Sequence, residues 1–450
     1  MILYLDWFLN KFNKYRHSIG LSFFFGGLPL VYFFRDGLKL APQSTAFTAA
    51  VAILSLLIAF PQNPKKLFQT NTFAYILCGL YAFMALTYVI FYAPNRGWFT
   101  NTPLEIGNQL VFIMGMFIFA GTSINALKDN FLQFTLVFCV LGGLSLLYYI
   151  AKNPAYVFGM RAAISFSDDK GMGSMGNPHI YAKSAYIGLV AGVILLKNEI
   201  RAFWRLVIYG SILILLMVIA MCQAMAIVLV TVIFLFVYII SNLKSHTIYK
   251  GLKWLFGWQG ILLFIGIIFG IYYLFNNTNI NVYIEAAFNL IYDRVERMAT
   301  SFFDSDTAKK VKFAGDDSAS TRVTNITAVF KYFMKNLKSG NIFEVIFGNG
   351  YQHYYVDSPF IEMLNDLGII GFILFTSLHV VIFGWVFKEI INPTCDFTLM
   401  VAYVFLITLI QNFTMGMPYD YGRWCSLAFI ARFALSYKKV SIKENLVLAN

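Results

Sequence analysis

The chain has 450 residues, of which 59% are apolar, 18% are aromatic and only 12% are charged. Soluble domains carry roughly 25% charged residues, so this composition excludes a soluble globular protein. The net charge of +12 does not indicate a nucleic-acid partner, because the basic residues can be assigned to one side of a membrane.

Repeated apolar runs predict an all-α fold, a polytopic transmembrane bundle, because a helix of roughly 20 apolar residues crosses the hydrocarbon layer of a bilayer. The run 204–241 is too long to cross once and is divided at Cys222 and Gln223, and span ten is also long, so its first turns are expected along the outer interface. We predict twelve spans, at 19–34, 43–60, 72–92, 105–126, 131–151, 179–196, 204–221, 223–241, 255–275, 358–387, 397–415 and 420–437.

These spans divide the chain into five parts. Residues 1–151 hold spans one to five, 152–178 form a first long loop, 179–275 hold spans six to nine, 276–357 form a second long loop, and 358–450 hold the last three spans and a tail. Residues 1–17 have the composition of an aromatic, basic interfacial segment rather than a cleavable signal peptide. The five cysteines lack the spacing of a zinc site or a disulfide framework.

Basic residues orient the predicted bundle. If the N-terminus is cytoplasmic, most Lys and Arg fall in cytoplasmic segments, whereas the short outer loops hold only Arg35, Lys39 and Arg96. This bias predicts that both termini are cytoplasmic and that both long loops lie outside. Within the second loop, residues 321–338 carry apolar side chains at a helical period, which predicts a helix on the outer surface.

Three predicted spans begin with a capping residue followed by proline, which suits the first residue of a helix. These pairs are Asn177-Pro178, Ser358-Pro359 and Thr102-Pro103. An outward N-terminus is a ready anion site. Thr102-Pro103, where Glu105 completes a capping box, serves as a control, because such caps suit any helix that re-enters the membrane.

Each long loop contains an arginine, a residue whose guanidinium can bind a phosphate through two hydrogen bonds. Arg161 lies in the first loop and Arg322 in the second. The alternative for each is a solvated surface charge. Arg322 is less ordinary, because a cation in the first turn of a helix opposes the helix dipole, although Asp316 and Asp317 can compensate for it.

The stretch 344–371 joins a glycine-rich turn to a span. Gly348 and Gly350 allow a ligand to approach bare backbone, or simply form a tight turn. Tyr351, Tyr355 and His353 offer flat faces on which sugars stack, or belong to an interfacial aromatic belt.

Three carboxylates lie close to this turn in the sequence. Asp357 can serve as general base or sugar ligand, or can cap the tenth span. Glu362 and Asp366 share one helix face, and carboxylates inside a span are usually functional.

The order of these motifs resembles the bacterial O-antigen polymerase and O-antigen ligase superfamily. The resemblance rests on Arg161 followed by Asn177-Pro178 and a span, then on S-x-x-x-R ending at Arg322, FGNG at 347–350 and VDSPFIEMLNDLGIIGF at 356–372. Its residue-level part covers about 155–185 and 318–375, and the twelve-span layout extends it over most of the chain.

The resemblance implies a glycosyltransferase at the periplasmic face of the bacterial inner membrane, which needs no metal or other cofactor. Its donor and acceptor would be glycans carried on undecaprenyl pyrophosphate. Its other partners would be membrane lipids, a chain-length regulator and a flippase. A polymerase of this kind joins repeat units of O-antigen, capsule or exopolysaccharide. A ligase instead transfers finished polymer to the lipid A core.

The resemblance also implies roles for residues. Arg161 and Arg322 would hold the pyrophosphate. The favoured base is Asp357, with His353 or Glu362 as alternatives. The expected substrate-binding residues are Asn177, His179, Gly348, Gly350, Tyr351, Tyr355, Glu362 and Arg423.

Two departures from the family pattern refine this expectation. Ligases carry His-Asn where this chain has Asp357-Ser358, which favours a polymerase. Many members have Ser-Arg at the turn after span seven, where this chain reads Met221-Cys222-Gln223-Ala224, and Arg423 is therefore considered as a further phosphate contact. The alternatives are an O-antigen ligase and a transporter or flippase for a lipid-linked sugar; the chain shows no convincing internal repeat of the kind found in transporters.

Overall fold

The computed structural model describes the chain in several stretches. Its described ranges are 2–61, 73–92, 102–153, 161–164, 177–198, 201–242, 317–414 and 416–433, with a few isolated positions between them. Side chains are described from Phe12 at the N-terminal end and from Thr324 in the stretch that begins at 317.

The chain forms two units. The first comprises Met1–Asn153, Arg161–Thr231 and Ile326–Asn450, and the second comprises Pro154–Met160 and Val232–Asn325. The functional site below is built from the first unit.

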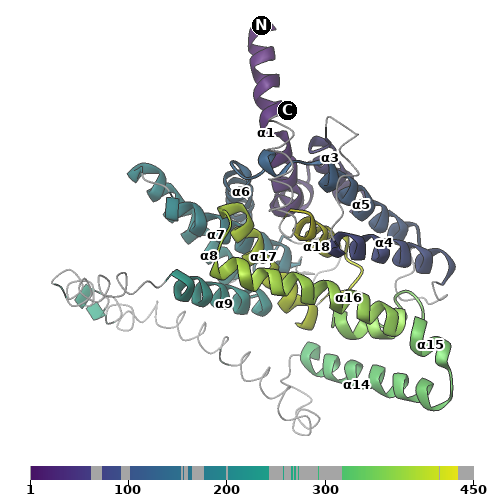
Figure 1. Ribbon diagram of the computed structural model, residues 1–450. Coiled ribbons are helices and arrows are strands. Elements are labelled where there is room, and N and C mark those ends of the chain that lie inside the picture. The colour runs from purple at the N-terminus through teal and green to yellow at the C-terminus, as the bar shows by residue number, and fades with distance from the viewer. Residues whose placement is uncertain are drawn as a thin grey trace. The chain divides into compact units, whose positions relative to one another are not determined.

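Within the described ranges the regular elements are all helices, shown in Figure 1. In chain order they are α1 (Ile2–Gly26), α2 (Leu28–Tyr32), the π-helix η1 (Phe33–Gly37), α3 (Thr45–Ile58), α4 (Phe73–Phe91), α5 (Thr102–Gly121), the 3₁₀ helix η3 (Ile124–Ala126), α6 (Phe131–Lys152), α7 (Pro178–Asn198), α8 (Ala202–Cys222), α9 (Met225–Asn242), α14 (Asp317–Lys338), α15 (Ile342–Phe347), α16 (Pro359–Ile391), α17 (Asp396–Thr414) and α18 (Tyr421–Phe433).

Many of these helices have the length and the apolar composition of membrane-spanning helices. Among the described residues, 8 helices are long and apolar enough to cross a bilayer, or up to 9 if the bent pair Phe12–Gly26 and Leu28–Gly37 is one span. A multi-pass helical bundle is therefore confirmed as the fold class. The count of twelve stays a prediction: α3 and α18 have 14 and 13 residues, short of the roughly 20 that a crossing needs, and span 255–275 lies almost wholly outside the described residues.

The divided apolar run 204–241 is confirmed as two helices. α8 ends at Cys222, and Gln223 after it has a left-handed backbone with φ of 48°. α9 begins two residues later, at Met225. A left-handed residue directly after a helix is a common way to end it.

The predicted first span at 19–34 is not one straight helix, because the helix breaks at Gly27. The two halves meet at 68°. Pro29, in the first turn of α2, cannot donate a backbone hydrogen bond, which explains why α1 does not continue through it.

The long tenth span also contains a break. α16 begins at Pro359 with Ser358 as N-cap, as predicted, but Gly368 within it has φ of 66° and ψ of −163°. This backbone conformation is open only to glycine. The over-long apolar run is therefore two helical segments joined at Gly368.

The amphipathic helix of the second loop is confirmed as α14, which begins at Asp317, a few residues before the predicted start. In its second half Val329 is buried, and the amide of Asn336 donates to the side-chain oxygen of Asn349 at 3.4 Å. α14 thus packs beside the glycine-rich turn that the sequence singled out.

The helices of the first unit pack in two groups. One group consists of α1, α2, α6, α7 and α8, and the other of α4, α5, α16 and α18. α17 packs against α7 in the first group and against α16 and α18 in the second. It therefore joins the two groups.

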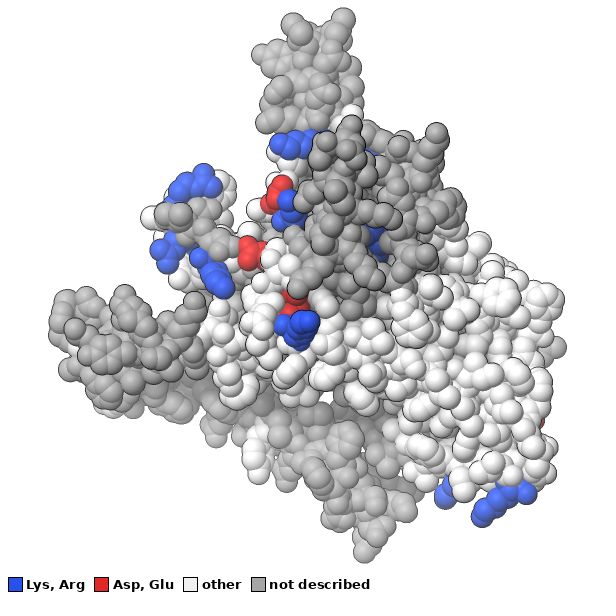
Figure 2. Space-filling model, viewed as in Figure 1, with Lys and Arg blue, Asp and Glu red and all other residues white. Residues whose placement is uncertain are grey.

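The outer surface of the bundle is largely apolar. Exposed side chains on α4 include Phe73, Ile76, Leu80 and Phe83, and those on α16 include Ile373, Val380 and Phe387. In Figure 2 the right-hand part of the surface is almost free of charged side chains, with Lys and Arg at its lower margin. Such a surface suits contact with lipid tails.

Candidate functional site

A cavity of about 550 Å³ lies where the two helix groups and α17 meet. The α1, α3 and α17 walls are mainly apolar, with Phe23, Phe24 and Val51 among the lining residues. Many of the polar side chains come from the N-terminal ends of α5, α7 and α18, either in the first two turns or directly before them. The predicted topology orients these three helices alike, and the structure brings their N-terminal ends together at one site.

Two cations line this cavity. Lys183 stands in the second turn of α7, and Arg423 in the first turn of α18. Arg423 is 5% exposed, and its Nη1 donates to Oδ1 of Asn412, whose amide in turn contacts the ring of His379. Among the described residues no hydrogen bond or ion pair engages Lys183.

Arg423 occupies a position that costs free energy, because a cation in the first turn opposes the helix dipole. Burying a cation adds a further cost unless it gains a partner. Lys183 and Arg423 line the cavity together with two acids, Glu105 and Asp420. The cavity therefore holds two cations that can donate to an anionic ligand, beside two carboxylates that partly balance their charge.

The start of α7 lies at the same cavity. Asn177 and His179, both expected to bind substrate, are among the lining residues. The helix begins at Pro178 as predicted, and Oδ1 of Asn177 accepts from the backbone N–H of His179 at 3.0 Å. The positive end of the helix dipole at this first turn adds partial positive charge on the same side of the cavity as Lys183.

The glycine-rich turn packs against the break in α16. A Cβ on Gly348 would lie 2.3 Å from the carbonyl oxygen of Asp366, and one on Gly368 would lie 2.3 Å from that of Ile346. The N–H of Gly350 donates to the Asp366 carbonyl at 3.0 Å. The close approach that Gly348 permits is therefore to the protein's own backbone, and Gly350 also takes part in this pairing.

Tyr351 is buried instead of offering a flat face to solvent. It is 2% exposed, and its ring centroid lies 4.1 Å from that of Tyr419. Its hydroxyl donates to Oε2 of Glu105 at 3.0 Å. Burial, followed by the proximity of Tyr81 and Glu105, raises the pKa of Tyr351, so its hydroxyl remains a donor.

The contacts of Glu105 correct its predicted role as a capping-box residue. Its hydrogen-bond partners are Tyr351 and the side chain of Asn108, whose Nδ2 lies 3.5 Å from Oε2. Glu105 lines the cavity. It therefore turns inward rather than back to the start of α5.

His353 and Tyr355 flank Tyr354, which is exposed. The Nδ1 of His353 lies 3.2 Å from the backbone oxygen of Asn349, and its ring lies 5.9 Å from that of Tyr332 on α14. The hydroxyl of Tyr355 donates to Oδ1 of Asp357 at 2.7 Å.

Asp357 links two parts of the chain. Its Oδ1 accepts from Tyr355 and also from the backbone N–H of Gly416, at 2.7 Å, in the connection between α17 and α18. Its backbone is left-handed, with φ of 59°, a conformation that Asp tolerates better than most residues. In the structure, Asp357 therefore holds the segment that contains Tyr355 against the connection between α17 and α18.

The two carboxylates on α16 are engaged within the fold. Glu362 is 1% exposed and Asp366 is fully buried. Glu362 accepts from the backbone N–H of Val356 at 3.2 Å, whereas Asp366 accepts from Asn365 at 2.7 Å and from Tyr419 at 3.1 Å. Both acids hold polar groups at the start of the broken helix, away from the cavity lining.

The two loop arginines lie in different surroundings. Arg161 is near the end of α8, because its neighbour Ala162 donates from its backbone N–H to the Met221 carbonyl at 2.9 Å. Nε of Arg161 is buried and has no hydrogen-bond partner among the described residues. Arg322 belongs to α14 in the second unit, and its side chain lies outside the described residues.

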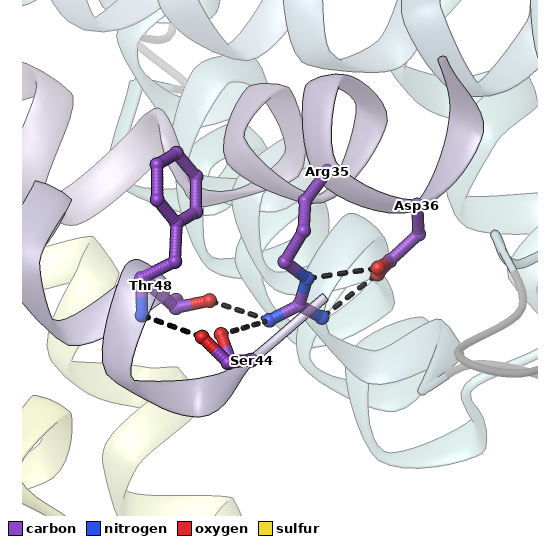
Figure 3. A network of polar contacts seen from close by, with 5 residues as sticks. Arg35, Asp36, Ser44 and Thr48 are labelled. Carbon is purple, nitrogen blue, oxygen red and sulfur yellow. Dashed lines mark hydrogen bonds and ion pairs between the residues drawn. The ribbon is translucent and has the colours of Figure 1, made fainter. Parts of the chain in front are cut away.

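Arg35, predicted to lie in a short outer loop, is instead fully buried in η1. Its guanidinium binds Asp36 through Nε and Nη2, at 2.8 and 2.7 Å, and donates to Thr48 at 2.6 Å (Figure 3). Nη1 of Arg35 also donates to the backbone carbonyl of Ser44 at 3.2 Å. With its donors taken by these groups, Arg35 fastens η1 to α3.

Of the twelve predicted site residues, three line the cavity: Asn177, His179 and Arg423. Sequence reasoning missed Lys183, although an ionisable residue inside an apolar span was available as a signal. It assigned Glu105 a structural role only. Gln352, Gln411 and Asp420 also line the cavity. No sequence pattern marked these three residues as part of a site.

Among the described residues no group of three or more His, Cys, Asp and Glu side chains is arranged to hold a metal ion. No protein-family model matches the chain, and a search of curated proteins finds no match either.

Proposed function

We propose that this protein is a membrane glycosyltransferase that polymerises oligosaccharide repeat units carried on undecaprenyl pyrophosphate. The observation that carries the proposal is the cavity: Lys183, Arg423 and the start of α7 line it together with apolar walls. A lipid with a pyrophosphate headgroup has this combination of an anionic and an apolar part, and the motif order described above supplies the reaction class.

In this proposal a hydroxyl of a new repeat unit attacks the anomeric carbon of the growing chain. Lys183 and Arg423 stabilise the departing pyrophosphate by charge, which is usually the largest catalytic contribution in such sites. Arg161 and Arg322 remain the contacts to the pyrophosphate that the sequence motifs propose.

The proposal includes a location. The protein is a twelve-span protein of the bacterial inner membrane with cytoplasmic termini, and the cavity is reached from the periplasmic side. Its product is O-antigen, capsule or exopolysaccharide, and its partners are a chain-length regulator and a flippase. The proposed reaction needs no cofactor.

An elongation assay tests the proposal. Purified full-length protein in detergent receives a radiolabelled lipid-linked repeat unit, and products are separated by chain length. Formation of a ladder is the expected result, and replacing Arg322 with Ala is expected to abolish long chains while the protein stays in the membrane. Wild-type protein that yields no ladder, or an Arg322→Ala variant with an unchanged ladder, contradicts the assignment.

A second function, transport of a lipid-linked sugar, is favoured by one observation. Broken helices are typical of transporters, and this chain has breaks at Gly27 and Gly368. Elongation in detergent, where no second compartment exists, excludes pure transport.

An O-antigen ligase is the alternative within the same reaction class. Deleting the gene separates the two: loss of a polymerase leaves lipid A core with a single repeat unit, whereas loss of a ligase leaves lipid-linked polymer and a bare core.

A further inference from the structure

We propose that Glu105 is the general base of the reaction, an assignment that rests on the proposed function. The acceptor sugar hydroxyl loses its proton to the Glu105 carboxylate as its oxygen bonds to the anomeric carbon. The bond from that carbon to the pyrophosphate oxygen breaks, and its electron pair leaves with the pyrophosphate. Glu105 then passes the proton to solvent.

Glu105 has the placement that a base needs. It lines the cavity that also holds Lys183 and Arg423. Both of its hydrogen bonds, from Tyr351 and from Asn108, reach the same oxygen, Oε2. Among the described residues no donor engages Oε1, so this oxygen can accept a proton from a ligand.

The carboxylate rests on a rigid support. Tyr351, its closer partner, is buried, stacks on Tyr419 and donates its backbone N–H to the Tyr92 carbonyl at 3.2 Å. Gln109 contacts the Tyr351 hydroxyl at 3.4 Å. A base held in one orientation loses little entropy when the acceptor binds.

Two other carboxylates near the site differ from Glu105 in accepting from backbone amides in the connection before α18 or at the start of that helix. Among the described residues, Asp420 is the second acid that lines the cavity, and its Oδ1 accepts from the N–H of Gly422 at 3.1 Å at the start of α18. Asp357, the base expected from the sequence, lies outside the cavity lining and accepts from Tyr355 and Gly416.

A counter-charge role for Glu105 makes a different prediction. If the carboxylate only balances the cavity cations, neutralising it strengthens or leaves unchanged the binding of an anionic donor and does not slow the chemical step. If it is the base, donor binding is retained while turnover at saturating substrate falls, because general-base contributions are typically about 10²- to 10⁴-fold.

The deciding experiment compares Glu105→Gln, Glu105→Asp and Asp357→Asn in the purified full-length protein. Elongation is measured at saturating radiolabelled lipid-linked repeat unit, and retention of the same lipid is measured in parallel. We expect Glu105→Gln to lose at least about 100-fold in rate with donor retention within about twofold of wild type. Glu105→Asp should recover part of the rate, and the loss in Asp357→Asn should be smaller than that in Glu105→Gln.

Glu344→Gln is the matched control, because Glu344 lies on α15, is half-buried and does not line the cavity. Its rate should equal that of wild type. If the wild type elongates and Glu105→Gln is unimpaired, the base assignment is overturned and the proposed function stands. The same holds if the wild type elongates and Asp357→Asn loses more rate than Glu105→Gln. A wild-type protein that does not elongate overturns the proposed function and this assignment with it. A Glu105→Gln variant that folds but no longer retains the donor assigns Glu105 to binding and also overturns the proposal.

Discussion

At the scale of single residues, the charges of the cavity are its most informative feature. Lys183 and Arg423 come from helices far apart in the sequence and line one cavity. Arg423 is buried and Lys183 is partly exposed, and the acids Glu105 and Asp420 line the same cavity. In the proposed function both cations contact the anionic headgroup of the donor.

Lys183→Ala and Arg423→Ala should therefore weaken retention of the lipid-linked donor. A hydrogen bond to a charged group contributes about 1.5–3 kcal/mol, so each loss should be about 10- to 100-fold. Lys183→Arg should retain most of the binding, because it keeps the charge. The measurement is retention of radiolabelled undecaprenyl-pyrophosphate-linked repeat unit by purified protein.

Lys197→Ala is the control for this pair, since Lys197 lies at the far end of α7 and outside the cavity lining. Equal retention by the Lys183→Ala and Lys197→Ala variants would show that the cavity cation takes no part in binding.

Residue roles were the hardest property to predict from the sequence. Asn177 and His179 were found because an N-cap and a proline mark a helix start, and such a start is a local feature. Glu105 fits the same local pattern, yet its side chain contacts Tyr351, which follows 246 residues later. Contacts of this kind depend on the fold and have no local signature.

At the scale of elements, the turn at 347–351 and the break in α16 form one structure. Gly348 and Gly368 approach each other so closely that neither has room for a Cβ, and both have positive φ. Asn349 and Gly350 donate to consecutive carbonyls of α16 at the break. These bonds satisfy groups that a broken helix would otherwise leave exposed inside the membrane.

Gly348→Ala should therefore lower the free energy of unfolding by about 2–5 kcal/mol, from the clash with the Asp366 carbonyl and the strain of a left-handed alanine. Gly384→Ala, in the second segment of the same helix, is the matched control, because a Cβ there meets nothing within 4 Å. Thermal unfolding followed by fluorescence size-exclusion chromatography measures both. Equal midpoints would contradict the packing role of Gly348.

The helices themselves were largely predictable, because apolar periodicity and proline caps are local signals. Helix breaks were predicted less well. The break after Cys222 was found from the length of the apolar run, whereas the break at Gly27 was missed, because the run there is no longer than one span. The π-helical turn that buries Arg35 against Asp36 was also missed, since both residues looked like loop charges.

At the scale of the whole molecule, topology connects the fold to the proposed function. The first turns of α5, α7 and α18 line one cavity, which agrees with the equal orientation that the charge bias predicted for these three helices. The side of the membrane on which that cavity opens follows only from the distribution of Lys and Arg.

Labelling of single cysteines tests this orientation. In a variant without the five natural cysteines, Ser339→Cys, at the end of α14, should react with a membrane-impermeant maleimide from the periplasmic side. Thr394→Cys, between α16 and α17, should react only after the membrane is opened. The reverse pattern would contradict cytoplasmic termini, and labelling of both positions in intact cells would contradict a crossing by α16.

The two amides that meet α16 have a consequence for variation in this chain. The backbone amides of Asn349 and Gly350 donate to two adjacent carbonyls of α16. The number of residues between these amides and Gly348 is therefore fixed. Surface loops usually tolerate changes of length, but an insertion here would move both amides away from the carbonyls that they bond to. Related chains are therefore expected to differ at this turn by side-chain identity, with length changes confined to the segments before α15 and after Tyr351.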